Sequence, residues 1–444
     1  MNIQWFQTTT AQPFFQRNIL PLQEESPNTL QLTGARGQTL RGFGGCFNEL
    51  GYLALAHANA AQRQAWMQTL FSPAEMGLRF CRIPIGASDY AAEWYSCDET
   101  EDDYALRRFS IARDRRYLIP YIREAQAVNP NLQFFASPWS PPTWMKKPKA
   151  YNYGTLRMEP KVLAAYAHYL QRFVQEYRQE GIPIVQVHVQ NEPFADQKFP
   201  SCRWSAEAFR VFIGEYLGPV FEKDRDGADI FLGTFNGPEE MTLLPGNRIQ
   251  LENYNRYVDS ILFDPQVLRY VKGIGYQWAG RTVIDKTHLS FPELELIQTE
   301  NECGDGTNSW AYAQYMFSLM CHYFRCGVTA YVYWNFILEA GGESTWGWKQ
   351  NSMATVEKDG TVLYQPEFYV MKHFARFVRP GAAVLGLSGH WSSAATAFEN
   401  RDGSRVLVMQ NALDRAEPVT LCDGGRKLTV ELQPRSFHTF VETE

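Results

Sequence analysis

The sequence predicts an α/β protein in which a (β/α)8 TIM barrel carries an associated antiparallel β-sandwich. Three observations lead to this prediction. Short β-rich runs alternate with helical patterns through most of the 444 residues. Beyond about Pro380 the helical patterns stop, and short strand-like runs are separated by turns such as Asp402-Gly403 and Gly424-Gly425. The first 40 residues also lack a helical period and are available to add strands to that second module.

Eight β-rich runs supply the predicted barrel strands. Each ends in polar or glycine residues and is followed by a helical pattern. A doubly wound open sheet is the structural alternative, but it usually has fewer strands and shows a Gly-rich phosphate turn when it binds a nucleotide. The runs cover residues 42–48, 78–86, 132–139, 184–192, 229–236, 271–278, 294–301 and 329–336.

Between these runs lie amphipathic segments, of which residues 160–180 are the clearest. Their apolar residues recur at helical spacing, and Pro160 suits the first turn of a helix. We therefore divide the chain into N-terminal strands (1–40), a catalytic barrel (41–378) and a C-terminal β-sandwich (379–444). Structural support is the favoured role of the sandwich, with separate sugar binding as the alternative.

The predicted sandwich strands are short. They cover residues 382–387, 395–399, 405–411, 417–422, 428–433 and 437–442.

Charge and hydropathy restrict the partners. The formal net charge is -6, from 42 basic and 48 acidic residues, and no basic stripe that would neutralise nucleic-acid phosphates is visible. No run approaches the roughly 18 apolar residues of a membrane-spanning helix. Aromatic residues make up 14% of the chain and either pack in the core or stack on sugars. The sequence leaves the oligomeric state open.

The cysteines and the amino terminus suggest a compartment. The eight cysteines are scattered without CxxC spacing, so they form a poor disulfide framework. The first residues lack a basic start followed by an apolar run of signal-peptide length. We therefore expect a reducing cytoplasm.

Polar side chains at the carboxyl ends of the strands should gather at one mouth of the barrel. Strand four ends at Asn191-Glu192-Pro193 and strand seven at Thr299-Glu300-Asn301. Two carboxyl groups placed across a barrel mouth suit glycoside hydrolysis, because one must be protonated and the other ionised. A separation of about 5–5.5 Å would predict retention through a covalent glycosyl-enzyme.

The two roles need opposite surroundings. We expect Glu300 to be the nucleophile, held ionised by Arg82 from strand two. We expect Glu192 to be the general acid/base, with a pKa raised by the charge of Glu300 and lowered once that charge is lost. Asn191 would donate to the 2-hydroxyl of the sugar.

Other functions remain open from spacing alone. A glutamate at a strand end is often an ordinary surface or salt-bridge residue, and Glu302 competes with Glu300. The histidines lack HxH or HExxH spacing, so a metal-dependent hydrolase is disfavoured, and His188 is interpreted as a core residue. A serine hydrolase lacks its GxSxG motif. A non-catalytic carbohydrate-binding protein is a further alternative, although both carboxylates are present.

Several longer motifs resemble glycoside hydrolase family 30, the glucosylceramidase-like retaining β-glycosidases. FFASPWSPPTWMK (134–146) is the most specific match, and GFGGCFNELGYLAL (42–55) and QNEP (190–193) support it. So do FCRIPIGASDYAAEWYSCDETEDDYALRRFSI (80–111), YWNFILEAGG (333–342) and DGSRVLVMQNALDRAEPVTL (402–421). The motifs keep the family's order and spacing over nearly the whole chain.

The resemblance implies a barrel fused to a β-sandwich, with no cofactor and no catalytic metal. Glu192 falls on the family's acid/base, Glu300 on its nucleophile and Arg82 on the arginine behind that nucleophile. The positions that hold the sugar in the first subsite correspond to Asp89, Trp139, Asn191 and Trp334, with Asn351 as a further contact. Of the tryptophans expected near the mouth, Trp139 and Trp334 are interpreted as sugar-stacking. Core or loop packing is favoured for Trp144, Trp346 and Trp348.

Strand six departs from the family. Gln277-Trp278-Ala279 stands where glucosylceramidase has His-Trp-Tyr, and that Tyr would contact the nucleophile. The residues after Glu300 also differ, which weakens ceramide glycoside as the substrate. We expect a small carbohydrate or an aryl or alkyl β-glycoside of glucose, xylose, fucose or galactose. The alternative is an endo-acting β-glycanase of the β-1,6-glucanase or xylanase type.

Overall fold

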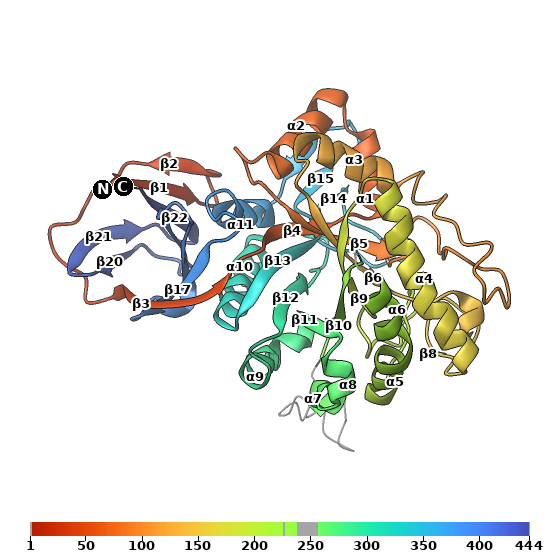
Figure 1. Ribbon diagram of the computed structural model, residues 1–444. Coiled ribbons are helices and arrows are strands. Elements are labelled where there is room, and N and C mark those ends of the chain that lie inside the picture. Colours follow the sequence, from red (N-terminus) through yellow and green to blue (C-terminus); the bar gives the residue numbers. More distant parts are fainter. Residues whose placement is uncertain (1, 225–226, 238–255, 444) are drawn as a thin grey trace, which may run out of the picture.

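Figure 1 shows the computed structural model of the chain, which describes residues 2–224, 227–237 and 256–443. A closed barrel surrounded by helices occupies one side of the molecule, and a curled β-sheet module occupies the other (Figure 1). The two chain ends lie close together on the β-sheet module. This architecture confirms the predicted fold class.

The barrel consists of parallel strands in the closed order β10-β11-β12-β13-β4-β5-β6-β9. Each strand coincides with one of the eight β-rich runs of the sequence. Their bounds are Gly42–Cys46 (β4), Phe80–Ile85 (β5), Gln133–Pro138 (β6), Ile184–His188 (β9), Asp229–Phe235 (β10), Val271–Gln277 (β11), Glu295–Glu300 (β12) and Val328–Asn335 (β13).

Apolar side chains fill the barrel interior below the mouth. Phe80, Phe135, Phe231 and Ile297 form one buried cluster there. His188 lies in the same layer, with ring centroids 4.7 Å from those of Phe135 and Phe231. Its burial lowers its pKa to about 3, so the ring is neutral. The interpretation of His188 as a core residue is confirmed.

Helices surround the barrel. Helix α4 (Pro160–Gln179) begins at the predicted proline and buries Val162, Tyr166, Tyr169 and Phe173, which recur every three or four residues. The other α-helices are α1 (Glu49–His57), α2 (Ala60–Phe71), α3 (Leu118–Val128), α5 (Ala206–Val211), α6 (Gly218–Lys223), α7 (Arg256–Leu262), α8 (Pro265–Leu268), α9 (Ile284–Ser290), α10 (Trp310–Arg325) and α11 (Pro366–Ala375). A π-helical turn, η2 (Phe212–Leu217), joins α5 to α6.

Short elements decorate the connections. They are the 3₁₀ turns η1 (Thr143–Met145), η3 (Trp278–Thr282) and η4 (Ser392–Ala394), the pair β7 (Lys146–Lys147) and β8 (Thr155–Leu156), and the small sheet of β14 (Ile337–Glu339), β15 (Ala354–Val356) and β16 (Val362–Tyr364).

The second module is a nine-stranded sheet in the order β2-β1-β22-β19-β18-β17-β3-β20-β21. Both ends of the chain contribute to it, and its core includes Trp5, Met409, Val419 and Phe440. Its strands are β1 (Asn2–Thr8), β2 (Phe15–Arg17), β3 (Thr29–Thr39), β17 (Ala383–Ser388), β18 (Ala395–Glu399), β19 (Arg405–Asn411), β20 (Glu417–Asp423), β21 (Arg426–Leu432) and β22 (Ser436–Thr443).

Helix α11 joins the two modules. The ring of His373 is buried and bonds Thr8 of β1 through Nε2 (2.9 Å) and Thr439 of β22 through Nδ1 (2.8 Å). The described part of the chain contains no helix long and apolar enough to cross a membrane.

Candidate active site

Glu192 lies just beyond strand β9. Regular pairing of β9 stops at His188, earlier than predicted, and a single bridge from Asn191 to Thr234 continues the line of the strand. Glu192 has a left-handed φ of 46°, which is unfavourable for a residue with a side chain, and its backbone N–H donates to the carbonyl of Thr234 at 3.0 Å. This turn carries the Glu192 carboxyl group to the barrel mouth.

Glu300 is the last residue of β12 and is 6% exposed. Its Oε2 accepts from Nη1 of Arg82 at 2.8 Å. Its Oε1 accepts from the indole N–H of Trp278 at 3.3 Å and from the thiol of Cys303 at 3.5 Å. Trp278 and Cys303 therefore supply the donors to Oε1 of Glu300 in this chain, which has Ala279 at the position of the family's tyrosine.

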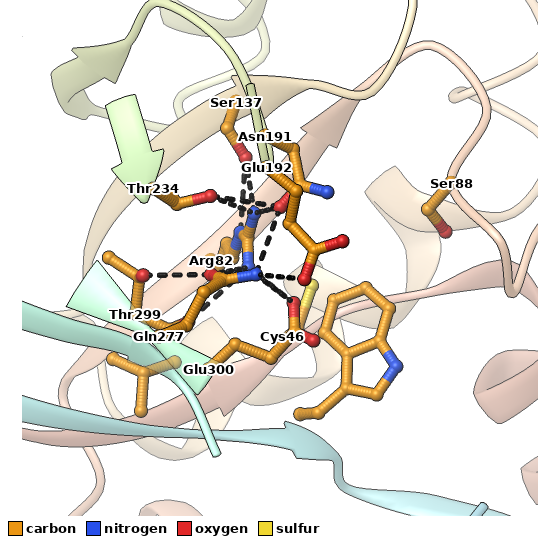
Figure 2. Close-up of polar contacts among 12 residues, drawn as sticks. Cys46, Arg82, Ser88, Ser137, Asn191, Glu192, Thr234, Gln277, Thr299 and Glu300 are labelled. Atoms are coloured by element: carbon orange, nitrogen blue, oxygen red, sulfur yellow. Dashed lines mark hydrogen bonds and ion pairs between the residues drawn. The ribbon is translucent and has the colours of Figure 1, made fainter. Parts of the chain in front are cut away.

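Arg82 lies at the base of the site. Besides Glu300, its guanidinium donates to Oδ1 of Asn191 at 2.6 Å and to Oγ of Ser137 at 2.8 Å (Figure 2). It also packs 4.4 Å from the ring centroid of Trp139. The side chain is fully buried, and it is not among the residues that line the cavity. Arg82 therefore lies behind Glu300, as expected of it, and does not contact the sugar, because protein groups occupy its donors.

Gln277, the last residue of β11, lies between the two glutamates (Figure 2). Its Nε2 is 3.0 Å from Oε1 of Glu192 and 3.3 Å from Oε2 of Glu300. Since one nitrogen contacts both side chains, the two carboxyl groups face the same point. The sequence marked this residue only as a departure from the family.

The electrostatic environment differs between the glutamates. Burial raises the pKa of both. At Glu300 the charge of Arg82 opposes this effect, aided by the N–H of Trp278 and the thiol of Cys303. At Glu192 the negative charge of Glu300 adds to the increase in pKa, and the amide of Gln277 reduces it. These effects favour the protonated form of Glu192 and the ionised form of Glu300.

A cavity of about 670 Å³ opens above the carboxylates, within the range of small-molecule sites. Of the side chains predicted for the first subsite, Asp89, Trp139 and Asn191 line this cavity, and Trp334 and Asn351 do not. Its walls are formed by Asp89, Trp139, Asn191, Glu192, Ala195, Gln197, Lys198, Phe199, Asn236, Trp278, Ala279, Arg281, Glu300, Glu302, Trp346, Gly347, Trp348 and Gln350.

Several polar groups around the cavity lack a partner. In the described residues, Oδ1 of Asp89 and the indole nitrogens of Trp334 and Trp346 are buried without a hydrogen bond. Burial raises the pKa of Asp89 to about 7, and the charge of Glu300 adds to that effect. Because unpaired buried polar groups are costly, these atoms are suited to the hydroxyl groups of a ligand.

Asn191 is oriented by its neighbours. Its Oδ1 accepts from Arg82 at 2.6 Å and from the hydroxyl of Thr234 at 2.9 Å. A guanidinium can only donate, so the oxygen must face Arg82 and the Nδ2 group must point away from it. The side chain lines the cavity, so this amide can donate to a ligand there.

Asn351 is not part of the site. Its Nδ2 donates to Oε1 of the buried Glu367 at 2.6 Å, and its Oδ1 accepts from the backbone N–H of Gly306 at 2.9 Å. The preceding residue, Gln350, lines the cavity instead and donates to Oδ2 of Asp89 at 3.4 Å. Successive side chains of an extended segment point in opposite directions, so a one-residue shift exchanges the two roles.

The tryptophans divide differently from the prediction. Trp139 lines the cavity. Trp334, which was also expected to stack on sugar, is buried against Trp139, with ring centroids 5.3 Å apart, and is not among the lining residues. Trp346 and Trp348 also line the cavity, which the packing role favoured for them did not include, and their ring centroids lie 5.1 Å apart. Trp144 is buried, as expected, and donates to the carbonyl of Asp98 at 3.0 Å.

Metal ligands are not clustered in the described ranges. Among those residues, no group of three or more His, Cys, Asp or Glu could hold a metal ion.

The fold and site together define a barrel of the glycoside hydrolase class, in which two carboxyl groups at strand ends face one cavity. The chain belongs to glycosyl hydrolase family 30. Residues 40–378 match the family's TIM-barrel domain, and residues 381–440 match its beta sandwich domain. The family resemblance predicted from the sequence is confirmed.

Individual relatives agree with this assignment. The chain is 26% identical to the lysosomal acid glucosylceramidase of Mus musculus over 91% of its own length and 81% of the relative's. It is 25% identical to the endo-1,6-beta-D-glucanase of Neurospora crassa over 87% and 81%. The crystal structure of SrfJ from Salmonella typhimurium shares the fold, with a TM-score of 0.88, 24% identity and 100% of both chains covered.

Proposed function

We propose that this protein hydrolyses β-linked sugars with retention of configuration, with Glu300 as the nucleophile and Glu192 as the general acid/base. The observation that carries the proposal is that one amide, that of Gln277, contacts both carboxylates while Arg82 contacts only Glu300. The distance between Oε1 of Glu192 and Oε2 of Glu300 cannot exceed the sum of their distances to Nε2 of Gln277. This closeness of the facing oxygens supports the retaining arrangement, in which the two carboxyl groups lie roughly 5–5.5 Å apart.

Two displacements account for the reaction. In the first, Glu192 gives its proton to the glycosidic oxygen while Glu300 attacks the anomeric carbon, so the bond to the leaving group breaks and a glycosyl ester forms. In the second, the Glu192 carboxylate takes a proton from water, and the resulting hydroxide oxygen displaces Glu300. The first displacement leaves Glu192 ionised, as the second requires, and the second returns the proton to Glu192 for the next cycle.

The first sugar should bind between Asp89, Trp139, Asn191 and Gln350. Asp89 brings an unpartnered carboxylate oxygen, Asn191 the Nδ2 group of its amide and Trp139 a flat apolar face. Hydroxyl groups on one edge of a ring can satisfy the polar atoms while the other face stacks.

The leaving-group half of the cavity is polar and aromatic. Arg281 and Glu302 form an ion pair at 2.5 Å, and Lys198 lies 4.9 Å from the ring centroid of Trp346. A second sugar or a small aryl group fits these walls better than a ceramide tail, which would leave the charges unsolvated. We therefore propose a saccharide or aryl β-glycoside as the substrate.

Endo action is the second candidate, because the similar Neurospora crassa protein is named as an endo-1,6-beta-glucanase. Nitrophenyl β-glycosides of glucose, xylose, fucose and galactose, followed by linkage-defined disaccharides and a β-1,6-glucan, distinguish the two. Release of single sugars from chain ends supports exo action, and early release of oligosaccharides supports endo action. We also propose a reducing compartment, since all eight cysteines are free thiols.

Two variants test the catalytic roles. Glu300→Gln should lose several orders of magnitude in turnover on every substrate, because covalent catalysis is removed. Glu192→Gln should lose least with a nitrophenol, which leaves without a proton, and added azide should restore part of the activity as a β-configured azide adduct. Near wild-type turnover by either variant, or a product of inverted configuration, would overturn the assignment.

A further inference from the structure

The amide of Gln277 is held in one orientation. Its Oε1 accepts from the hydroxyl of Thr299 at 2.9 Å and from Nη1 of Arg82 at 3.4 Å (Figure 2). The guanidinium of Arg82 has no acceptor, so only the amide oxygen can face it. The Nε2 group must then face the carboxylates, and the side chain is fully buried among them.

The Nε2 group has two hydrogens and three acceptors within reach. These are Oε1 of Glu192 at 3.0 Å, Oε2 of Glu300 at 3.3 Å and Oδ1 of Asn191 at 3.3 Å. The hydrogens are therefore shared, and their division follows the charge on each acceptor, because a charged acceptor forms the stronger hydrogen bond.

We propose that Gln277 is a positioning residue that directs the catalytic proton to Oε2 of Glu192 and follows the negative charge from Glu300 to Glu192 during the reaction. This inference rests on the proposed function. An amide nitrogen has no lone pair to accept a hydrogen bond, so Oε1 of Glu192 remains an acceptor and the proton belongs on Oε2. Figure 2 shows Oε2 turned away from Gln277.

The same donor serves both half-reactions. While Glu300 is ionised and Glu192 protonated, Nε2 helps to hold the charge on Glu300. Once Glu300 is an ester it is neutral and Glu192 is the anion, so the shared hydrogens strengthen their bond to Glu192. An amide does not titrate, so this contact stays a donor at every working pH. A histidine at this position would change its charge within that range.

Gln277→Met tests the inference, because methionine has a similar length and no N–H. Loss of the donor removes a group that stabilises the Glu192 anion, so the pKa of Glu192 should increase. The basic limb of kcat/KM should then move to higher pH. We expect a loss of about tenfold with a nitrophenyl glycoside and roughly 10²–10³-fold with an alkyl glycoside or disaccharide that needs the proton.

Gln277→His supplies the second variant. Its ring can return one N–H to the carboxylates, so it should recover part of the loss on the poor leaving group. Gln186→Met is the matched control, since Gln186 is also a fully buried glutamine of a barrel strand but bonds Glu295 and His188 instead. It should change the thermal unfolding midpoint without changing the leaving-group dependence.

Two results would overturn the inference. One is a Gln277→Met enzyme with an unmoved basic limb, and the other is an equal loss on good and poor leaving groups. Labelling of Glu300 by a 2-deoxy-2-fluoro glycoside, followed by peptide mass spectrometry, separates this failure from that of the proposed function. If the wild type is not labelled, the double displacement fails. If it is labelled while Gln277→Met keeps the wild-type profile, only the role of Gln277 fails.

Discussion

Asp89 illustrates how single side chains shape this site. It is 5% exposed, one of its oxygens accepts only a long bond from Gln350, and the other has no partner in the described structure. Burial raises the pKa of Asp89 to about 7. A buried aspartate with a purely structural role is usually paired with a cation or with hydrogen-bond donors. An unpaired carboxylate beside the cavity is therefore best explained by a ligand that completes its hydrogen bonds.

Asp89→Asn tests this explanation at the residue scale. The amide keeps the shape of the side chain and loses the charge, so a sugar hydroxyl loses a charge-assisted hydrogen bond worth about 1.5–3 kcal/mol. We expect kcat/KM on the best nitrophenyl glycoside to fall roughly 10–100-fold. Asp102→Asn, at an exposed loop position, is the control. An Asp89→Asn enzyme with unchanged kcat/KM would exclude Asp89 from the sugar site.

At the scale of elements, the barrel depends on close approach between strands. Gly44 of β4 lies against β5, where an added Cβ would sit 1.7 Å from the carbonyl oxygen of Phe80. A backbone atom cannot move aside as the end of a flexible side chain can, so even one methyl group must separate the strands. This constraint explains why the strand that carries Cys46 toward the site is so rich in glycine.

Gly44→Ala should therefore destabilise the barrel. We expect the free energy of unfolding to fall by roughly 1–3 kcal/mol or more through overpacking. Gly37→Ala in β3 is the matched control, since its nearest neighbour, the carbonyl oxygen of Val384, would lie at an ordinary 3.6 Å. Urea denaturation followed by tryptophan fluorescence measures both. Equal midpoints for the two variants would contradict the role assigned to Gly44.

At the scale of the whole molecule, a buried neutral histidine, His373, joins helix α11 to the sheet module. His373 bonds strands from both chain ends, and burial lowers its pKa to about 3. Burial also lowers the pKa of His438, which accepts from the indole N–H of Trp5 at 3.1 Å. Protonation of His373 would place a buried charge between helix α11 and the sheet, and protonation of His438 would place one inside the sheet module.

Acid should therefore weaken this interface. Above pH 6.5 His373 is neutral in both the folded and unfolded chains and adds no pH dependence. Below pH 6.5 His373 becomes protonated in the unfolded chain, whereas in the folded chain it stays neutral down to about pH 3. Stability should thus fall by up to about 1.4 kcal/mol per pH unit in that window.

His373→Gln should remove that part of the slope. Urea denaturation of the wild type and the variant at pH 7.0, 6.0 and 5.0 measures it, and the variant keeps an amide that can bond Thr8 and Thr439. Parallel pH dependences for the two proteins would show that His373 does not titrate between the folded and unfolded states.

Much of the architecture follows from local sequence. The eight barrel strands and helix α4 were predicted because hydrophobic period, proline and glycine positions are properties of neighbouring residues. The same reasoning nominated Glu192 and Glu300, since parallel strands bring their carboxyl ends to one mouth wherever they lie in the chain. The structure brings these two side chains to a single cavity.

Tertiary structure decided what surrounds the glutamates. Gln277 meets a carboxylate 85 positions away, and no local pattern reports such a contact. The resemblance assigned a sugar contact to Asn351, but its neighbour Gln350 lines the cavity instead. Sequence position alone does not show which of two neighbouring side chains points toward the cavity. The chain's local order determines which groups reach the mouth, whereas only three-dimensional packing decides which of them face one another.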